Sequence, residues 1–502
     1  MVFSSIIFLF LFLPVVLLLY RLIPRTQIVG QNIFLLLVSS LFYFYGEQEK
    51  ILLLYAVVCL NYLCARYVYS GVKDEFYEPQ MELLGTFRPY EAKRRGQTMA
   101  MMACVVVCIG LLWYFKYFNF TLDILTYVSQ GTLNFEHIGK VILPLGISFY
   151  TFHVLSYSLD IYFGRMALER NLLNFASYVL MFPQLVAGPI VRYRDIMHQF
   201  RRRTVTSIGF ANGVRRFCYG LAKKVLLANT VSVYADKIFA TDPAALSVGD
   251  AWLGALAYAL QIYFDFSGYS DMAIGLALMF GFHYKENFNY PYIAKSAGEF
   301  WHRWHISLST WLRDYVYIHL GGNRSGLYKT CRNIMLVFLC SGLWHGANIT
   351  FVCWGGIYGL CGVLEKLGLR NFLHAHYIFA HVYLLLVALA GWVMFRADSV
   401  SYACDYLAVM YGLGPSGWQA LALTQPVATN IWAAIALGVF FSCDWRPVYK
   451  RIVRSLARAC GRAQVAFLSA KLLSYGVAVL LFVVSAASII SSSYNPFIYF
   501  RF

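Results

Sequence analysis

Charged side chains are scarce in this chain, and acidic ones are the scarcest. Only 24 of its 502 residues are Asp or Glu, and charged residues of both signs make up 13%, whereas 60% are apolar and 18% aromatic. A chain so poor in charge could not stay dispersed in water, which excludes a soluble globular protein. The composition therefore predicts an all-α integral membrane protein.

Two further absences limit the function. The 41 Lys and Arg residues give a net charge of +17, yet no nucleic-acid-binding motif accompanies them. They cluster between apolar segments, as at residues 201–203 and 446–462, and the positive-inside rule explains such clusters better than nucleic acid does. None of the 12 cysteines has the paired C-x-x-C spacing of a zinc site. We therefore expect neither a nucleic-acid partner nor a metal.

Long apolar runs recur along the whole chain and predict roughly a dozen membrane-embedded helices. Arg21 and Arg25 follow the first run, so we expect a retained first span whose N-terminus is extracytoplasmic, and a cytosolic loop at 69–97. Pro183 and Pro189 interrupt the run at 172–190, which predicts a re-entrant or tilted helix there.

No internal repeat and no Ser/Pro/Gly-rich linker divides the sequence. We therefore expect a single polytopic membrane domain over 1–502. Its predicted parts are N-terminal helices at 1–130, a catalytic core at 131–370 and C-terminal helices at 371–502.

The first candidate site is the segment 301–309, WHRWHISLS. If a continuous helix runs through it, His305 falls on an apolar, aromatic face with Trp301 and Trp304, while His302 looks toward the interface or water. His305 is therefore the better candidate for chemistry. An alternative is that His305 merely satisfies a carbonyl beneath an interfacial helix whose tryptophans anchor at headgroup level.

The second candidate is His345, which stands in a run from Ile334 to Leu364 without any Asp, Glu, Lys or Arg. A neutral imidazole can accept a proton from a hydroxyl and return it near working pH. Gly342 and Gly346 flank it and would let a substrate or another backbone approach closely. The alternative is that this Gly-x-x-x-Gly pattern is only a helix-packing face, with His345 bridging to a neighbour.

Other polar residues in apolar surroundings are weaker candidates. Asp265 and Asp271 could orient a histidine or tie helices together, and Asn348 adds polarity beside His345. The remaining supporting candidates are Trp304, Arg313 and Asp314.

Several motifs together resemble the membrane-bound O-acyltransferase family. They are residues 144–150 (PLGISFY), 187–189 (AGP), 264–271 (FDFSGYSD), 299–307 (EFWHRWHIS), 311–315 (WLRDY), 321–324 (GGNR) and 343–347 (LWHGA). Within that family the chain most resembles the membrane proteins of alginate O-acetylation, a branch that is also similar to those acting on peptidoglycan and cellulose.

The resemblance implies a ring of about eleven to thirteen tilted, short and re-entrant helices around a thinned centre with a through-tunnel. The family's signature histidines correspond to His305 and His345, with His345 catalytic. The implied reaction takes acetyl groups from a cytosolic donor, acetyl-CoA, to an exported polysaccharide such as alginate, in the bacterial inner membrane. Implied partners are a periplasmic SGNH-hydrolase-like acetyltransferase or other export-complex proteins, and no cofactor is bound permanently.

Donor recognition has no short motif of its own in the sequence. Arg192, Arg194, Lys223 and Lys224 could steer the donor's phosphates, although charge that sets topology explains them as well. Two alternatives to the acetylation reading stay open. One is a transporter or flippase of an acyl carrier or glycan without acyl chemistry; the other is D-alanyl or peptidoglycan acyl transfer within the same family.

Overall fold

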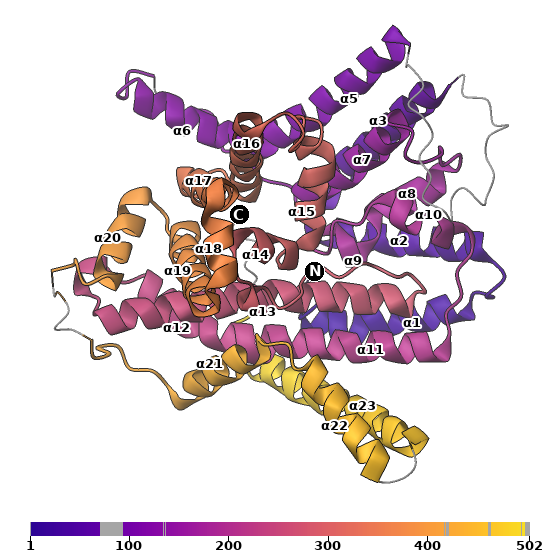
Figure 1. Ribbon diagram of the computed structural model, residues 1–502. Coiled ribbons are helices and arrows are strands. Elements are labelled where there is room, and N and C mark those ends of the chain that lie inside the picture. Colours follow the sequence, from indigo (N-terminus) through magenta and orange to yellow (C-terminus); the bar gives the residue numbers. More distant parts are fainter. Residues whose placement is uncertain are drawn as a thin grey trace. The chain divides into compact units, whose positions relative to one another are not determined.

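The computed structural model describes residues 2–70, 94–133, 135, 137–415, 417, 421–459, 463–492 and 494–496. Within these residues every regular element is a helix, which confirms the all-helical prediction (Figure 1). Most of the predicted cytosolic loop, residues 71–93, lies outside the described part of the chain.

The chain divides into two compact units, each with its own internal contacts. The first contains Ile7–Ser207 and Phe280–Tyr284, and the second contains Phe3–Ile6, Ile208–Met279 and Lys285–Phe502. The predicted partition of one membrane domain into three parts stays a prediction.

The first unit is built from helices in sequence order. They are η1 (Phe8–Phe12), α1 (Leu13–Leu22), α2 (Ile28–Glu47), α3 (Ile51–Tyr69), α5 (Arg95–Leu112), η4 (Trp113–Tyr117), α6 (Phe118–Val128), α7 (Ile147–Tyr162), α8 (Leu172–Leu180), α9 (Phe182–Leu185) and α10 (Tyr193–Arg201). The apolar run that prolines interrupt is indeed broken, since α8 stops before Met181 and the four-residue α9 follows. Its path through a membrane stays a prediction.

The second unit holds both candidate histidines. Its main helices are α11 (Ser207–Ala222), η5 (Lys223–Ala228), α12 (Asn229–Phe239), α13 (Val248–Met279), α14 (Ala297–Arg303), α15 (Ile306–Leu312), η8 (Arg313–Tyr317), α16 (Leu327–His345), α17 (Ile349–Leu364), α19 (Tyr377–Arg396), α20 (Val400–Met410), α21 (Thr429–Phe441), α22 (Arg446–Ala459) and α23 (Ala463–Ser491). Short helical turns connect them: η6 (Pro243–Ala245), η7 (Pro291–Ile293), η9 (Glu365–Leu369) and α18 (Arg370–Ala375).

Several helices suit a lipid surrounding. Four helical segments in the described residues are long and apolar enough to cross a membrane. The pair α21 and α22, bent by 78°, would count as a fifth only if the two helices formed one span. Leu37 and Leu41 on α2 and Leu472 and Leu473 on α23 are each at least 60% exposed, which would be costly in water. The expected number of eleven to thirteen embedded helices stays a prediction.

Helices α16 and α17 form a tightly packed hairpin beside His345. A Cβ atom on Gly342 would overlap the carbonyl oxygen of Phe351, and one on Gly355 would overlap that of Phe338. Gly346 is equally confined, because its Cβ would enter the Phe351 ring. Close helix packing is therefore sufficient to require glycine at positions 342 and 346.

This packing predicts a sharp difference between adjacent glycines of α17. We expect Gly355→Ala to lower the free energy of unfolding by about 1–3 kcal/mol, because two helix backbones must separate. Gly356→Ala is the matched control: a Cβ there meets nothing within 4 Å, so the change should be neutral or slightly stabilising. Thermal unfolding of the purified variants in one detergent would test this, and equal midpoints would refute the packing argument.

Candidate active site

The two histidines of segment 301–309 lie in different environments. Helix α14 ends at Arg303 and α15 starts at Ile306, so the predicted continuous helix through this segment is wrong. His305 stands between the two helices with φ of +42°, in the left-handed region that non-glycine residues rarely adopt. Its side chain is nevertheless fully buried, whereas His302 is exposed, as predicted.

Contacts with Asn287 hold this unusual turn in place. The backbone N–H of Ile306 donates to the Asn287 carbonyl at 2.9 Å. The backbone N–H of Ser307 and its hydroxyl both donate to Asn287 Oδ1, at 3.2 and 2.8 Å. At its other end, Asn287 Nδ2 donates to Ser270 Oγ on α13 at 3.0 Å. These bonds compensate a conformational cost of about 1–2 kcal/mol at His305.

The same amide fixes the tautomer of His305. A backbone N–H can only donate, so the Asn287 atom that faces Ser307 N must be the oxygen. That oxygen lies 3.2 Å from His305 Nδ1, and Ser307 Oγ lies 3.3 Å from it. Since the Ser307 hydroxyl donates its proton to the same Asn287 oxygen, both neighbours of Nδ1 are left as acceptors, which favours a proton on Nδ1. Nε2 then carries the lone pair, and it has no hydrogen-bond partner among the described residues. The contact of Asn287 with His305 could not be predicted from the sequence, because 18 residues separate the two.

His345 ends helix α16 in an aromatic enclosure. It is 5% exposed, and its ring lies 5.0 to 5.3 Å, centroid to centroid, from the rings of Trp344, Trp354 and Phe395. It borders a small cavity of about 10 Å³, room for one water molecule. The cavity is lined by Ile262, Phe266, Trp304, His345, Trp354, Trp392 and Phe395. The expected through-tunnel stays a prediction.

The two candidate histidines lie beside the same two aromatic side chains, Phe266 and Trp344. Phe266 packs edge-on against the His305 ring at 4.7 Å and also lines the cavity of His345. Trp344 lies 5.9 Å from the His305 ring and 5.0 Å from the His345 ring. Two titratable rings thus share an environment from which bulk water is largely excluded.

Of the predicted supporting residues, only Trp304 lies in this pocket, where it lines the cavity and stacks on Phe300 at 5.6 Å. Asn348 instead caps α17, accepting from Thr350 N at 3.1 Å and donating to the Asp398 carbonyl at 3.0 Å. Arg313 pairs with its neighbour Asp314 at 2.6 Å, and the Arg313 side chain is 54% exposed.

Asp265 and Asp271 belong to ion pairs of α13 with the α11–η5 helix. Asp265 pairs with Lys224 at 2.8 Å, and both side chains are almost completely buried. Asp271 pairs with Lys223 and with Arg216, each at 2.7 Å. These ion pairs tie α13 to the α11–η5 helix, and a supporting role of the two carboxylates in the site stays a prediction. It also follows that Lys223 and Lys224, two residues considered for donor phosphates, already have anionic partners.

Glu365, which the sequence did not single out, anchors α14 from the end of α17. Its carboxylate accepts from the backbone N–H groups of Ala297 and Gly298 at 2.6 and 3.0 Å, and from the Tyr383 hydroxyl at 3.2 Å. A carboxylate at a helix N-terminus satisfies otherwise unpaired donors. It fixes the helix that leads into His305.

A buried pair of histidines in an all-helical membrane protein defines a candidate for proton-transfer chemistry inside the bilayer. Comparison with known proteins identifies the family to which this chain belongs. The family model "MBOAT, membrane-bound O-acyltransferase family" matches residues 111–402. The chain belongs to this family, as its motifs predicted, and is an O-acyltransferase.

Full-length relatives are similar to this chain throughout. It is 40% identical to a probable alginate O-acetylase, AlgI, of Pseudomonas putida and 41% identical to that of Azotobacter vinelandii, with all of both chains covered in each case. It is 33% identical to a peptidoglycan O-acetyltransferase of Helicobacter pylori, over 82% of this chain and 80% of that protein.

Proposed function

We propose that this protein is the membrane component of alginate O-acetylation, which takes acetyl groups from cytosolic acetyl-CoA and passes them across the bacterial inner membrane. The similarity to alginate O-acetylases over the whole chain supports acetyl as the transferred group and alginate as the polymer that receives it. The observation that carries the chemistry is that His305 and His345 are both buried and share the aromatic neighbours Phe266 and Trp344.

The proposed reaction needs only these imidazoles and two substrates. His345 accepts the proton of an acceptor hydroxyl as the oxygen attacks the thioester carbon. The carbon–sulfur bond then breaks, the acetyl ester is complete, and the departing thiolate takes the proton from His345. A water-poor pocket suppresses competing hydrolysis of the donor.

The tautomer of His305 limits the role that this residue can have in the proposed reaction. Its Nδ1–H is committed to Asn287, so its free Nε2 can accept a hydrogen bond but cannot donate one. Beside His345, His305 could either orient the acyl group or share the proton, and a nitrogen that can only accept favours the second role. His305 would accept a hydrogen bond from the acceptor hydroxyl or from protonated His345.

A partner completes the proposal. A periplasmic SGNH-hydrolase-like acetyltransferase, or another protein of an export complex, would place the acetyl group on the polymer. The resemblance to this branch of the family supports such a partner, and the described residues of this chain form only helices. The N-terminus would lie on the extracytoplasmic side.

Deleting the gene in its host tests the choice of polymer. We expect acetyl esters to disappear from exported alginate and to persist on peptidoglycan, and the gene supplied in trans to restore them. Unchanged alginate acetylation together with a loss of acetyl esters from peptidoglycan would instead favour peptidoglycan as the substrate. The relative from Helicobacter pylori is named as a peptidoglycan O-acetyltransferase.

Asn287 is expected to act as a positioning residue for His305. We expect Asn287→Leu to reduce kcat at least about tenfold with little change in KM, because the tautomer and ring orientation are no longer fixed. Asn287→Asp retains an acceptor for Nδ1–H and should recover much of the activity. Steady-state kinetics of both variants would show this, and equal losses of kcat would mean that Asn287 only supports the fold.

A further inference from the structure

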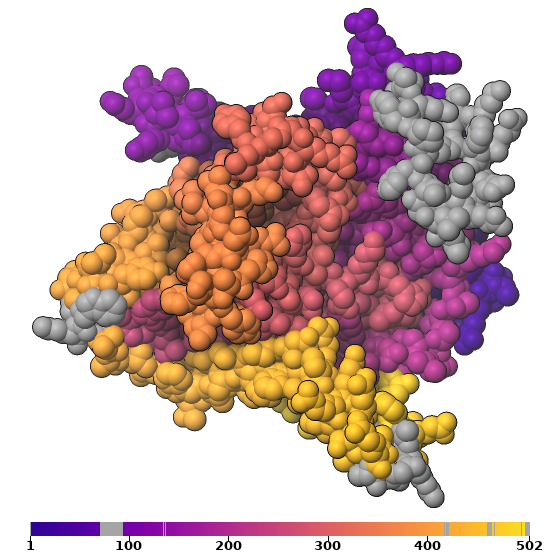
Figure 2. All heavy atoms as spheres, in the orientation of Figure 1, coloured from indigo at the N-terminus to yellow at the C-terminus, as the bar shows by residue number. Residues whose placement is uncertain are grey.

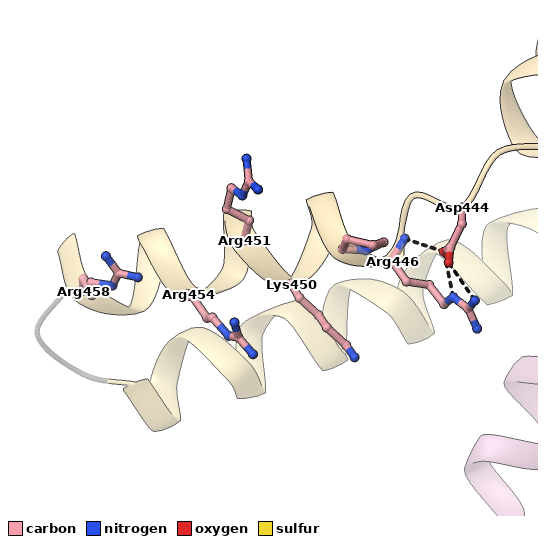
Figure 3. Close-up of a pocket in the computed structure, with 7 residues that line it drawn as sticks. Asp444, Arg446, Lys450, Arg451, Arg454 and Arg458 are labelled. Atoms are coloured by element: carbon pink, nitrogen blue, oxygen red, sulfur yellow. Dashed lines mark hydrogen bonds and ion pairs between the residues drawn. The ribbon is translucent and has the colours of Figure 1, made fainter. Parts of the chain in front are cut away.

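Helix α22 carries a concentration of positive charge that the acyl-transfer site does not use. The α21–α22 break bends the chain by 78°, and α22 then packs along α23 with most of its surface open (Figures 2 and 3). Its exposed cations are Arg446, Lys450, Arg451, Arg454 and Arg458, and the helix contains no acidic residue.

These cations border an open groove of about 630 Å³, which Asp444 and Pro447 complete. Asp444 is the one acid in the groove, and it is already bound by Arg446, at 2.7 Å. Lys450, Arg451, Arg454 and Arg458 have no ion pair with any residue that the structure describes. Four cations thus border the groove without an acidic partner among the residues that the structure describes.

Apolar side chains are exposed on the side of α22 opposite its cations. At about 100° per residue, the cations occupy one side of the helix, whereas Val448, Tyr449, Ile452 and Leu456 occupy the opposite side. Each of these four apolar side chains is at least 44% exposed. Val453 and Ala457 form a narrow buried stripe at one edge of the cationic side.

We propose that α22 lies along the membrane surface and binds the phosphate headgroups of anionic phospholipids in its basic groove. Only a lipid surface satisfies both sides of the helix at once: the apolar side enters the acyl-chain boundary while the cations stay at headgroup level. A soluble polyanion, whether a phosphorylated acyl donor or an acidic polysaccharide, would neutralise the groove but leave four large apolar side chains in water.

Hydrogen exchange of the full-length protein in lipid nanodiscs tests this proposal locally. We compare phosphatidylcholine alone, phosphatidylcholine with about 30% phosphatidylglycerol, and phosphatidylcholine with free CoA in solution. Anionic lipid is expected to slow amide exchange in residues 446–459 at least about threefold, and CoA is expected to have no such effect.

Matched triple variants separate the groove from overall charge. In R451Q/R454Q/R458Q the protection by phosphatidylglycerol should be lost, whereas K237Q/K329Q/K366Q removes the same charge from exposed positions elsewhere and should behave as the wild type. The proposal fails if phosphatidylglycerol gives no protection, if the groove variant is still protected, or if the control loses protection equally. Equal protection by CoA would overturn it in favour of a donor site. Because the readout is local exchange, it is independent of whether the protein acetylates alginate.

Discussion

Replacing His345 with alanine is expected to reduce acetyl esters on the exported polymer by about a hundredfold or more. The imidazole is the proposed proton acceptor, and the buried rings around it, Trp344, Trp354 and Phe395, cannot take over that role. Ester content of the purified polymer gives the measurement, and immunoblotting of isolated membranes shows that the variant is inserted and abundant. Undiminished acetylation in an abundant variant would contradict the assignment.

The neighbouring histidines provide an internal control. His305→Ala should also cause a large loss, because the buried His305 ring packs on Phe266 and Trp344, which also lie beside His345 or its cavity. His302→Ala should have little effect, because the His302 side chain is exposed. Equal losses at positions 302 and 305 would show that burial and pocket geometry do not separate the two residues.

The buried Lys224–Asp265 pair predicts the largest effect on stability. Lys224→Met leaves the Asp265 carboxylate charged and almost completely buried, and we expect it to lower the free energy of unfolding by about 3–5 kcal/mol. The double variant Lys224→Met with Asp265→Leu removes both charges and should recover most of that loss. Thermal unfolding of the two purified proteins provides the comparison.

An adjacent pair serves as the control for this experiment. Lys223 is one third exposed, and Asp271 keeps Arg216 as a second partner when Lys223 is removed. Lys223→Gln should therefore cost less than about 1 kcal/mol. If Lys223→Gln and Lys224→Met were equally destabilising, burial would not be what distinguishes these ion pairs.

The sequence was sufficient for features that depend on composition and on local motifs. Low charge predicted the helical membrane protein, and the motifs around His305 and His345 predicted the family. The exposure of His302 also came out correctly, although the helix used to argue it does not exist: α14 stops before Trp304.

Features that depend on distant residues could not be predicted in this way. The left-handed turn at His305 is held by Asn287, and α14 is anchored by Glu365, which lies more than 60 residues further along the chain. Neither partner follows from helical periodicity. The pairing of Asp265 with Lys224 could not be predicted either. A charged residue in an apolar segment is expected to have a partner, but the sequence does not show which residue that is.

The central claim is that this protein itself performs acyl chemistry with its paired imidazoles. The most direct measurement is CoA release from radiolabelled acetyl-CoA by the purified protein in liposomes, with a membrane-permeant hydroxyl acceptor, for the wild type and for His345→Ala. We expect the wild-type protein to release CoA and form labelled ester, and His345→Ala to do neither. Equal turnover by the variant, or labelled acetyl-CoA crossing the membrane intact, would contradict it and favour a transporter.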